Sequence, residues 1–189
     1  MEKSLLVVLL LGVALMSYAP ISELFVGEEL GTCSCGSIQS MVAWAEGTRK
    51  CVYKDSLGIP TVGIGFNMKR GDARTIFKKY GINYDSVLSG KKCLSDKQVT
   101  DLFNHDLVWA KSGAKHCVPS FSKHNKCIQN VLMDMTFNMG QNSLCSWKTF
   151  NGHLAAKHYK SAGSYVKSTL YCKQVGRRCT RNVNLIESC

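Results

Sequence analysis

Ten cysteines constrain the fold of this 189-residue chain more than any other feature of its sequence. An even number of cysteines predicts a disulfide framework that joins all of them in pairs. About 945 pairings are possible with ten cysteines, so the sequence leaves the connectivity open. Because disulfides persist in oxidising compartments, this interpretation also predicts a secreted, extracellular protein. The cysteines are Cys33, Cys35, Cys51, Cys93, Cys117, Cys127, Cys145, Cys172, Cys179 and Cys189.

The N-terminal residues have the pattern of a secretory signal peptide. A short polar start with Lys3 precedes an apolar run over residues 5–16, and Ser17 and Ala19 are small residues where export proteases cleave. A membrane anchor is the alternative, but the run is shorter than the roughly 20 apolar residues of a bilayer span. We therefore predict a signal peptide over residues 1–19. Pro20 disfavours cleavage directly after Ala19, so the exact cleavage site stays open.

Length and charge predict one folded, cationic domain after this leader. The chain has 24 basic and 13 acidic residues, and 24 − 13 gives a net charge of +11. We assign residues 20–35, which lack periodicity, to an N-terminal extension and residues 36–189 to the domain. A positive field attracts polyanions, including nucleic acids, anionic membranes and bacterial surfaces. Charge alone does not distinguish among them.

The cysteine and histidine spacing argues against a metal site. No two cysteines have the two-residue gap of a zinc knuckle, and the histidines are scattered along the chain. His153 and His158 are five residues apart, which does not place them on one helix face. A cysteine in a disulfide also has no thiolate for nucleophilic catalysis. We therefore expect no metal and no cofactor.

A short amphipathic helix is predicted from residue 38 onward. Gly47 is typical of a helix stop, so Glu46 falls in the last turn. A carboxyl group there lies at the negative end of the helix dipole, which favours its protonated form. The apolar residues at helical spacing are Ile38, Met41, Val42 and Ala45.

A β-hairpin is predicted next, with strands at residues 51–53 and 59–64 around a turn that begins at Asp55. Pro60 cannot donate a backbone hydrogen bond, so we expect it at a sheet edge or a bulge. Gly63 and Gly65 alternate along the second strand and would leave one face without side chains. Another group could approach that face closely.

The rest of the chain is predicted to be helical. Ser95 and Gln98 form a capping box that starts a helix of about four to five turns, ending near Gly113. A second helix ends at Met139, with Gly140 as its stop. Shorter helices are expected around residues 149–160 and 163–171. The predicted fold class is α+β, with a small N-terminal lobe of helix and hairpin and a larger helical lobe. The two apolar stripes comprise Val99, Leu102, Phe103 and Leu107, then Ile128, Val131, Leu132 and Met135.

The residues around the hairpin resemble the active-site signature of the phage-type lysozymes, glycoside hydrolase family 24. Taken singly, Glu46 is typical of a solvated helix end and Asp55 of a turn. The glutamate nine residues before the aspartate, and the threonine six after it, match the family pattern. The matching segments are Glu46-Gly47-Thr48-Arg49, Tyr53-Lys54-Asp55, Gly58 and Thr61-Val62-Gly63-Ile64-Gly65, followed more sparsely by Phe137-Asn138-Met139-Gly140 and Gly176-Arg177-Arg178 with Arg181.

The resemblance implies a role for each matching residue. Glu46 would donate a proton to the glycosidic oxygen, Asp55 would help a water molecule attack the sugar, and Thr61 would hold that water. The implied activity is inverting hydrolysis of the β-1,4 bond between N-acetylmuramic acid and N-acetylglucosamine in bacterial peptidoglycan, for antibacterial defence or digestion of bacteria. Asn67 and Phe137 would line the substrate groove. Arg177 or Arg178 would fold back against Glu46 as a supporting residue.

Two features depart from the family. Phe66 stands where the family often has histidine, so an ion pair built on that histidine is missing here. The cysteines are atypical of phage enzymes, which act in a reducing cytoplasm, and they indicate an animal-like protein that uses the fold outside the cell.

Alternative functions remain open. A catalytically silent cationic protein could bind bacterial surfaces on the same scaffold, and a shift of substrate to chitin is also compatible. Nucleic-acid binding is not expected, because Arg177-Arg178 and Lys78-Lys79 are short basic pairs without interleaved aromatic residues. The predicted partners are therefore peptidoglycan and the anionic bacterial surface, and we expect a monomer.

Overall fold

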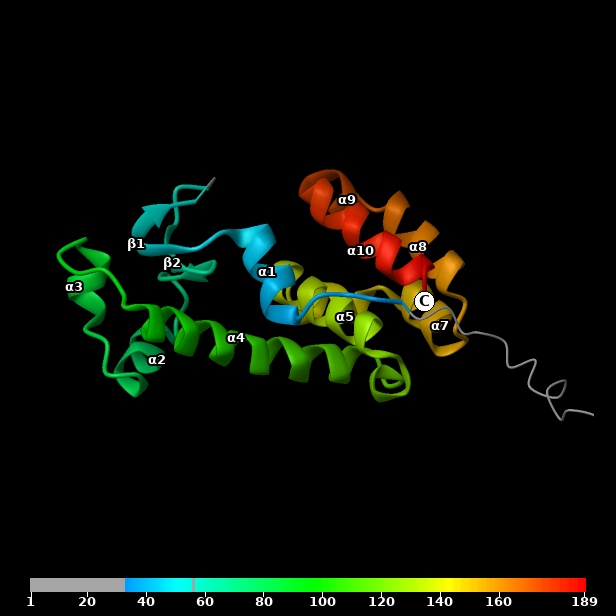
Figure 1. Ribbon diagram of the computed structural model, residues 1–189, viewed down its shortest axis with the longest axis horizontal. Helices are drawn as coiled ribbons and strands as arrows, with labels where there is room; N and C mark the ends of the chain where they lie inside the picture. Colours follow the sequence, from blue (N-terminus) through cyan, green and yellow to red (C-terminus); the bar gives the residue numbers. More distant parts are fainter. Residues whose placement is uncertain (1–32, 56) are drawn as a thin grey trace, which may run out of the picture. The chain divides into compact units, whose positions relative to one another are not determined.

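The computed structural model describes residues 33–55 and 57–189 (Figure 1). The predicted signal peptide, and residues 20–32 of the predicted extension, lie outside the described residues. Among the helices of the described part, none has the length and hydropathy needed to cross a bilayer.

The predicted helix α1 (Ile38–Glu46) comes first, and its buried residues Ile38, Met41 and Val42 pack in the core formed by the later helices, not under the sheet. The side chain of Ser37 accepts a hydrogen bond from the backbone N–H of Ser40 and caps its start. At its end Gly47 adopts φ 72°, a conformation that glycine reaches without strain. Three strands follow, β1 (Arg49–Lys54), β2 (Pro60–Gly63) and β3 (Phe66–Asn67), and then the short helices α2 (Ala73–Lys79) and α3 (Tyr84–Leu88).

The hairpin is confirmed, but the expectation for Pro60 is wrong. The strands pair antiparallel in the order β1-β2-β3, so Pro60 lies on the central strand. It is the first residue of that strand, where a missing N–H removes little pairing, and its carbonyl accepts from the N–H of Met68. The register irregularity lies instead on β1, between Arg49 and Tyr53.

The long helix α4 (Asp96–Cys117) starts at the predicted capping box, since Ser95 and Gln98 bond each other's backbone N–H. It does not end near Gly113 as expected. Gly113 is an interior position where α4 packs against a neighbouring helix, because a Cβ there would lie 2.9 Å from Cγ2 of Thr136.

The helical lobe contains one 3-10 turn, η1 (Phe121–Lys123), and six further helices in the described residues. The predicted helix α5 (Lys126–Met139) ends at Gly140 with φ 82°. The helices after α5 are α6 (Gln141–Ser146), α7 (Lys148–Ala155), α8 (Tyr159–Ser168), α9 (Leu170–Val175) and α10 (Arg177–Glu187). The expected helical segments around residues 149–160 and 163–171 are divided among α7, α8 and α9. Sequence periodicity missed α2, α3, α6 and α10.

Two hydrophobic cores define the lobes and confirm the α+β class with a small sheet lobe and a larger helical lobe. The first core lies under the sheet and includes Val62, Phe66 and Phe77. The second lies among the later helices. Helix α4 contributes to both, with Leu102 in the first core and Phe103 in the second. The two lobes therefore share helix α4.

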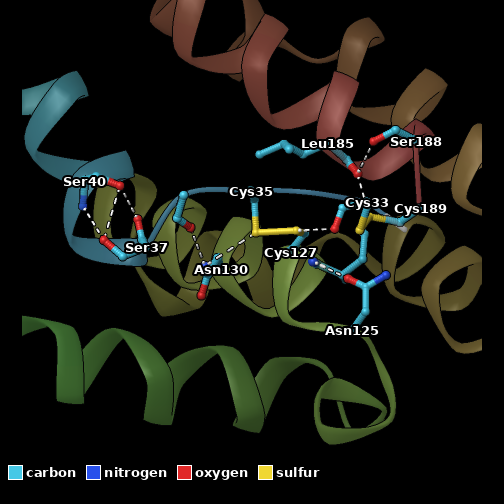
Figure 2. Close-up of a disulfide and its surroundings, with 12 residues drawn as sticks. Cys33, Cys35, Ser37, Ser40, Asn125, Cys127, Asn130, Leu185, Ser188 and Cys189 are labelled. Atoms are coloured by element: carbon cyan, nitrogen blue, oxygen red, sulfur yellow. Dashed lines mark hydrogen bonds between the residues drawn. A yellow bond between two sulfur atoms is a disulfide. The ribbon is translucent and has the colours of Figure 1, made fainter. Parts of the chain in front are cut away.

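All ten cysteines are paired, as the even count predicts. Two bridges tie the segment before α1 to the helical lobe, and Figure 2 shows Cys35 bonded to Cys127 at the start of α5. Asn130 also donates from Nδ2 to the Gly36 carbonyl oxygen, at 3.1 Å. The pairs are Cys33–Cys189, Cys35–Cys127, Cys51–Cys93, Cys117–Cys145 and Cys172–Cys179.

Candidate active site

Glu46 is the last residue of α1 and its side chain is partly exposed, at 24%. Arg178 at the start of α10 donates from Nη1 to Oε1 of Glu46, at 2.6 Å. Within the described residues, no hydrogen bond is made to Oε2. One oxygen of the carboxyl group is therefore held in place, while the other has no protein donor.

A buried carboxylate holds Arg178 in this position. Asp134 on α5 is fully buried and accepts hydrogen bonds from Arg178, Arg181 and Asn182. Burial lowers the pKa of Arg178, but the negative charges and hydrogen bonds of Asp134 and Glu46 outweigh it, so its pKa lies above the usual value. Arg178 is therefore a fixed positive charge against Glu46.

Asp55 lies at the hairpin turn directly after β1. Its Oδ1 accepts from the backbone N–H groups of Leu57 and Ile59, at 2.8 and 2.9 Å, which is the geometry of a side chain that builds its own turn. Within the described residues, Oδ2 has no donor. Asp55 thus resembles Glu46 in having one oxygen fixed and the other without a protein partner.

Thr61 lies on β2, opposite Tyr53 of β1, and is only 4% exposed. Its hydroxyl donates to the Ile59 carbonyl oxygen at 3.0 Å. Because that proton is engaged, the hydroxyl can bind a further molecule only by accepting a hydrogen bond.

Tyr53 experiences the charge of both candidate carboxylates. Burial raises its pKa, and the negative charges of Glu46 and Asp55 raise it further, whereas Arg49 lowers it. The arginine lies over the Tyr53 ring at 4.8 Å. Both carboxylates therefore act on one side chain of β1.

The turn glycine Gly65 makes a close approach to Glu46. A Cβ at this position would lie 3.1 Å from Oε2 of Glu46, and the residue has φ +70°. Gly63 instead faces Val99 and Leu94 of the core. The expectation that both glycines leave one open strand face is therefore wrong, because both have positive φ and the chain turns between them. The group that approaches Gly65 is the candidate acid itself.

Two surface hollows extend from these residues. Asn67 and Phe137 line a hollow of about 160 Å³ that Gly65 also borders. Glu46 lines a second hollow, of about 420 Å³, with Trp44 and both Arg177 and Arg178.

The two arginines expected near Glu46 have different positions. Arg178 is buried and bonds Glu46, whereas Arg177 is exposed and lies over the Trp44 ring at 5.5 Å. Sequence reasoning missed Asp134. Its signal is a lone carboxylate within the apolar stripe of α5, three residues after Val131.

Comparison with known proteins assigns the family. A sequence model described as "Phage lysozyme" matches residues 43–180, which is more than half of the chain. The chain belongs to the phage lysozyme family. A probable T4-type lysozyme 1 of Dictyostelium discoideum is 25% identical over 161 residues, covering 80% of this chain and 94% of that protein. The endolysin of Salmonella phage P22 is 28% identical over 117 residues, covering 62% of this chain and 69% of the endolysin.

Membership of a lysozyme family supports a hydrolase. The matched segment of the phage lysozyme family contains Glu46, Asp55, Thr61, Asn67 and Phe137. It also contains Arg177 and Arg178, whereas the cysteines at positions 33, 35 and 189 lie outside it. Two of the five bridges therefore involve residues beyond the family segment.

Proposed function

We propose that this protein is a secreted lysozyme that hydrolyses the β-1,4 bond between N-acetylmuramic acid and N-acetylglucosamine in bacterial peptidoglycan. The observation that carries the proposal is the pair of carboxyl groups at Glu46 and Asp55, each with one oxygen fixed by the protein and one without a donor among the residues that the structure describes. Glycoside hydrolysis needs one carboxyl group to protonate the leaving oxygen and another to assist the incoming group.

Each residue of the proposed site has one task. Glu46 protonates the glycosidic oxygen through Oε2, while Arg178 fixes the orientation of the group through Oε1. Asp55 accepts a proton from a water molecule through Oδ2 as that water attacks the anomeric carbon. Thr61 positions the water by accepting its second hydrogen bond, because its own proton is donated to Ile59. Asn67 and Phe137 line the glycan groove.

Export and charge fit an extracellular target. Five disulfides require an oxidising compartment to persist. The net charge of +11 favours association with anionic bacterial surfaces. The activity would serve antibacterial defence or digestion of bacteria.

The proposal is tested by the variant Glu46→Gln in a turbidity assay on bacterial walls. The amide keeps the shape of the side chain but has no acidic proton, so lysis should be abolished while the thermal midpoint stays close to that of the wild type. Asp55→Asn should retain more activity, since Thr61 can still hold the water. Lysis by Glu46→Gln at the wild-type rate would favour the alternative of a non-catalytic cationic protein.

The stereochemistry of the first product tests the role of Asp55. Attack by water inverts the anomeric carbon, whereas attack by the carboxylate retains its configuration through a covalent intermediate. We therefore expect an α-configured first product from the β-linked glycan, observed by NMR. A β-configured first product, or a sugar trapped on Asp55, would show that this residue is a nucleophile.

A further inference from the structure

We propose that Trp109 is a sugar-binding platform that extends the glycan groove beyond Phe137. The protein would then hold a longer stretch of glycan than the bond-cleaving residues require. This inference rests on the proposed function and specifies how the substrate is bound. It concerns a residue of α4 that the sequence reasoning did not select.

Trp109 is a large aromatic residue that remains exposed, as does Trp44 beside Glu46. The exposed fraction of Trp109 is 45%, while its neighbours Asp106 and Ala110 on the same helix are buried. Burying an indole ring contributes strongly to binding, and its N–H can donate a hydrogen bond at the same time. An exposed tryptophan at the edge of a hollow is therefore suited to a ligand with both apolar and polar faces.

Shared residues connect Trp109 to the proposed acid. Gly65 lies against the carboxyl group of Glu46 and also borders the hollow that contains Asn67 and Phe137. Trp109 closes the same hollow. It also lines another hollow, of about 400 Å³, which does not contain Glu46. The proposed groove therefore runs from Glu46 past Gly65 and Phe137 to Trp109 and then into the 400 Å³ hollow, whose other lining residues are Met139, Gly140, Gln141 and Asn142.

The lining of the 400 Å³ hollow fits a neutral sugar. Gln141 and Asn142 supply amide donors and acceptors for hydroxyl and N-acetyl groups, and none of the described residues that line it is charged. The charges in the neighbouring hollow compensate each other, because Arg70 pairs with the buried Asp106 at 2.7 Å. A pyranose ring has one apolar face that can lie on the indole while its hydroxyl groups reach the amides.

A third hollow beside Trp109 offers a different route, which we do not assign to the glycan. It measures about 450 Å³ and is lined by Lys79, His105 and Asn104, among others. It shares no residue with the hollows of Glu46 and Phe137 except Trp109 itself. Asn104 and Asn142 therefore provide a matched pair of amides, one in each of two hollows that Trp109 also lines.

Binding is tested by NMR on the full chain carrying Glu46→Gln, so that hydrolysis does not intervene. The chain has three tryptophans, and the indole N–H signal of Trp109 is identified by its loss in the added variant Trp109→Phe. Titration with long peptide-free glycan oligosaccharides should shift this signal. If the signal is unmoved when the protein is saturated with the long glycan, the inference is wrong.

Kinetics test whether the platform matters for catalysis. Trp109→Ala should lower kcat/KM on long glycans by about three- to tenfold through a higher KM, which is the range expected for one aromatic contact. The loss should be smaller on short glycans, and Trp109→Phe should restore most of it. Equal losses on long and short glycans would overturn the inference.

The two amides define the route of the glycan. Asn142→Ala should weaken the binding of long glycans, whereas Asn104→Ala should leave it unchanged, and the reverse result would overturn the assigned route. This inference and the proposed function fail separately. Absence of hydrolysis of any glycan by the wild type, with a shifted Trp109 signal, would contradict the proposed function and support the platform.

Discussion

The buried carboxylate of Asp134 connects the core of the helical lobe to the candidate acid. It lies on α5, binds Arg178 and Arg181 of α10, and through Arg178 acts on Glu46 of α1. Removing one partner of a buried ion pair leaves an uncompensated charge in a low-dielectric environment. The position of Glu46 therefore depends on a residue that does not contact it.

At the same scale, Asp134→Asn should destabilise the protein by about 3 to 5 kcal/mol, because two arginines lose their buried counter-charge. Wall lysis should also fall, because Arg178 is no longer held against Glu46. Urea unfolding and the turbidity assay measure the two effects. Asp85→Asn is the control, since its pair with Arg74 lies on the surface and should matter little.

Gly65 offers a second prediction about a single residue. Gly65→Ala should reduce lysis strongly, because the added Cβ would lie 3.1 Å from Oε2 of Glu46. Gly81→Ala is the matched control, since Gly81 also has positive φ but has no atoms within 4 Å of its Cβ position. Both variants should lose roughly 1 to 2 kcal/mol of stability from backbone strain. Equal activity in the two would contradict the close approach.

His124 predicts a pH dependence of stability. The residue is buried, and its ring nitrogens lie 2.9 Å from Oγ of Ser120 and 3.1 Å from Oη of Tyr159. Burial lowers its pKa, and the positive charge of Lys157 lowers it further. On acidification the unfolded chain therefore binds the proton at a higher pH than the folded chain. The stability that neutral, buried His124 gives the folded state is present at neutral pH and is lost as the pH falls below about 6.5.

Thermal midpoints measured on both sides of that pH test the assignment. His124→Gln should show a smaller loss of stability on acidification than the wild type, because the titrating group is gone. His116→Gln, which changes an exposed histidine of α4, should keep the wild-type dependence. If the two variants behave alike, another group is responsible.

At the scale of elements, the close packing of α4 against Thr136 of α5 depends on Gly113. Alanine in a helix interior normally stabilises by roughly 0.5–1 kcal/mol relative to glycine. Gly113→Ala should instead destabilise by about 1 to 3 kcal/mol, because its Cβ would lie 2.9 Å from Cγ2 of the buried Thr136. Gly152→Ala on α7 is the control and should stabilise, since its Cβ meets no atom within 4 Å. Denaturant unfolding gives both values.

At the scale of the whole molecule, removing one of two disulfides should mainly lower stability, and removing the other should also lower wall lysis. Cys33–Cys189 spans 156 residues and Cys172–Cys179 spans seven, so loop-closure entropy predicts losses of about 5 and about 2 kcal/mol when each pair is replaced by alanine. The short bridge encloses Gly176, Arg177 and Arg178. Its removal should therefore reduce wall lysis more than its effect on urea unfolding suggests. A greater loss of stability from the short bridge, together with a greater loss of wall lysis from the long bridge, would contradict this prediction.

Local features of the fold could be predicted from the sequence. Helix α1 ends at Gly47, α4 starts at the capping box of Ser95 and Gln98, and α5 ends at Gly140, because each boundary depends on residues a few positions apart. The hairpin follows from alternation and turn residues in the same way. The roles proposed for Glu46, Asp55 and Thr61 come from the family signature, which is also local.

Long-range contacts were decided only by the tertiary structure. Glu46 and Arg178 are 132 residues apart, and the sequence left open whether Arg177 or Arg178 would reach the acid. The disulfide pairing, the burial of Asp134 and the exposure of Trp109 depend in the same way on how the helices pack. The sequence by itself determined helix α1, the hairpin, the start of α4, the end of α5 and the pairing of all the cysteines, because backbone preferences and composition act locally. Which side chains meet was decided by packing, since many partners along the chain are compatible with the same local pattern.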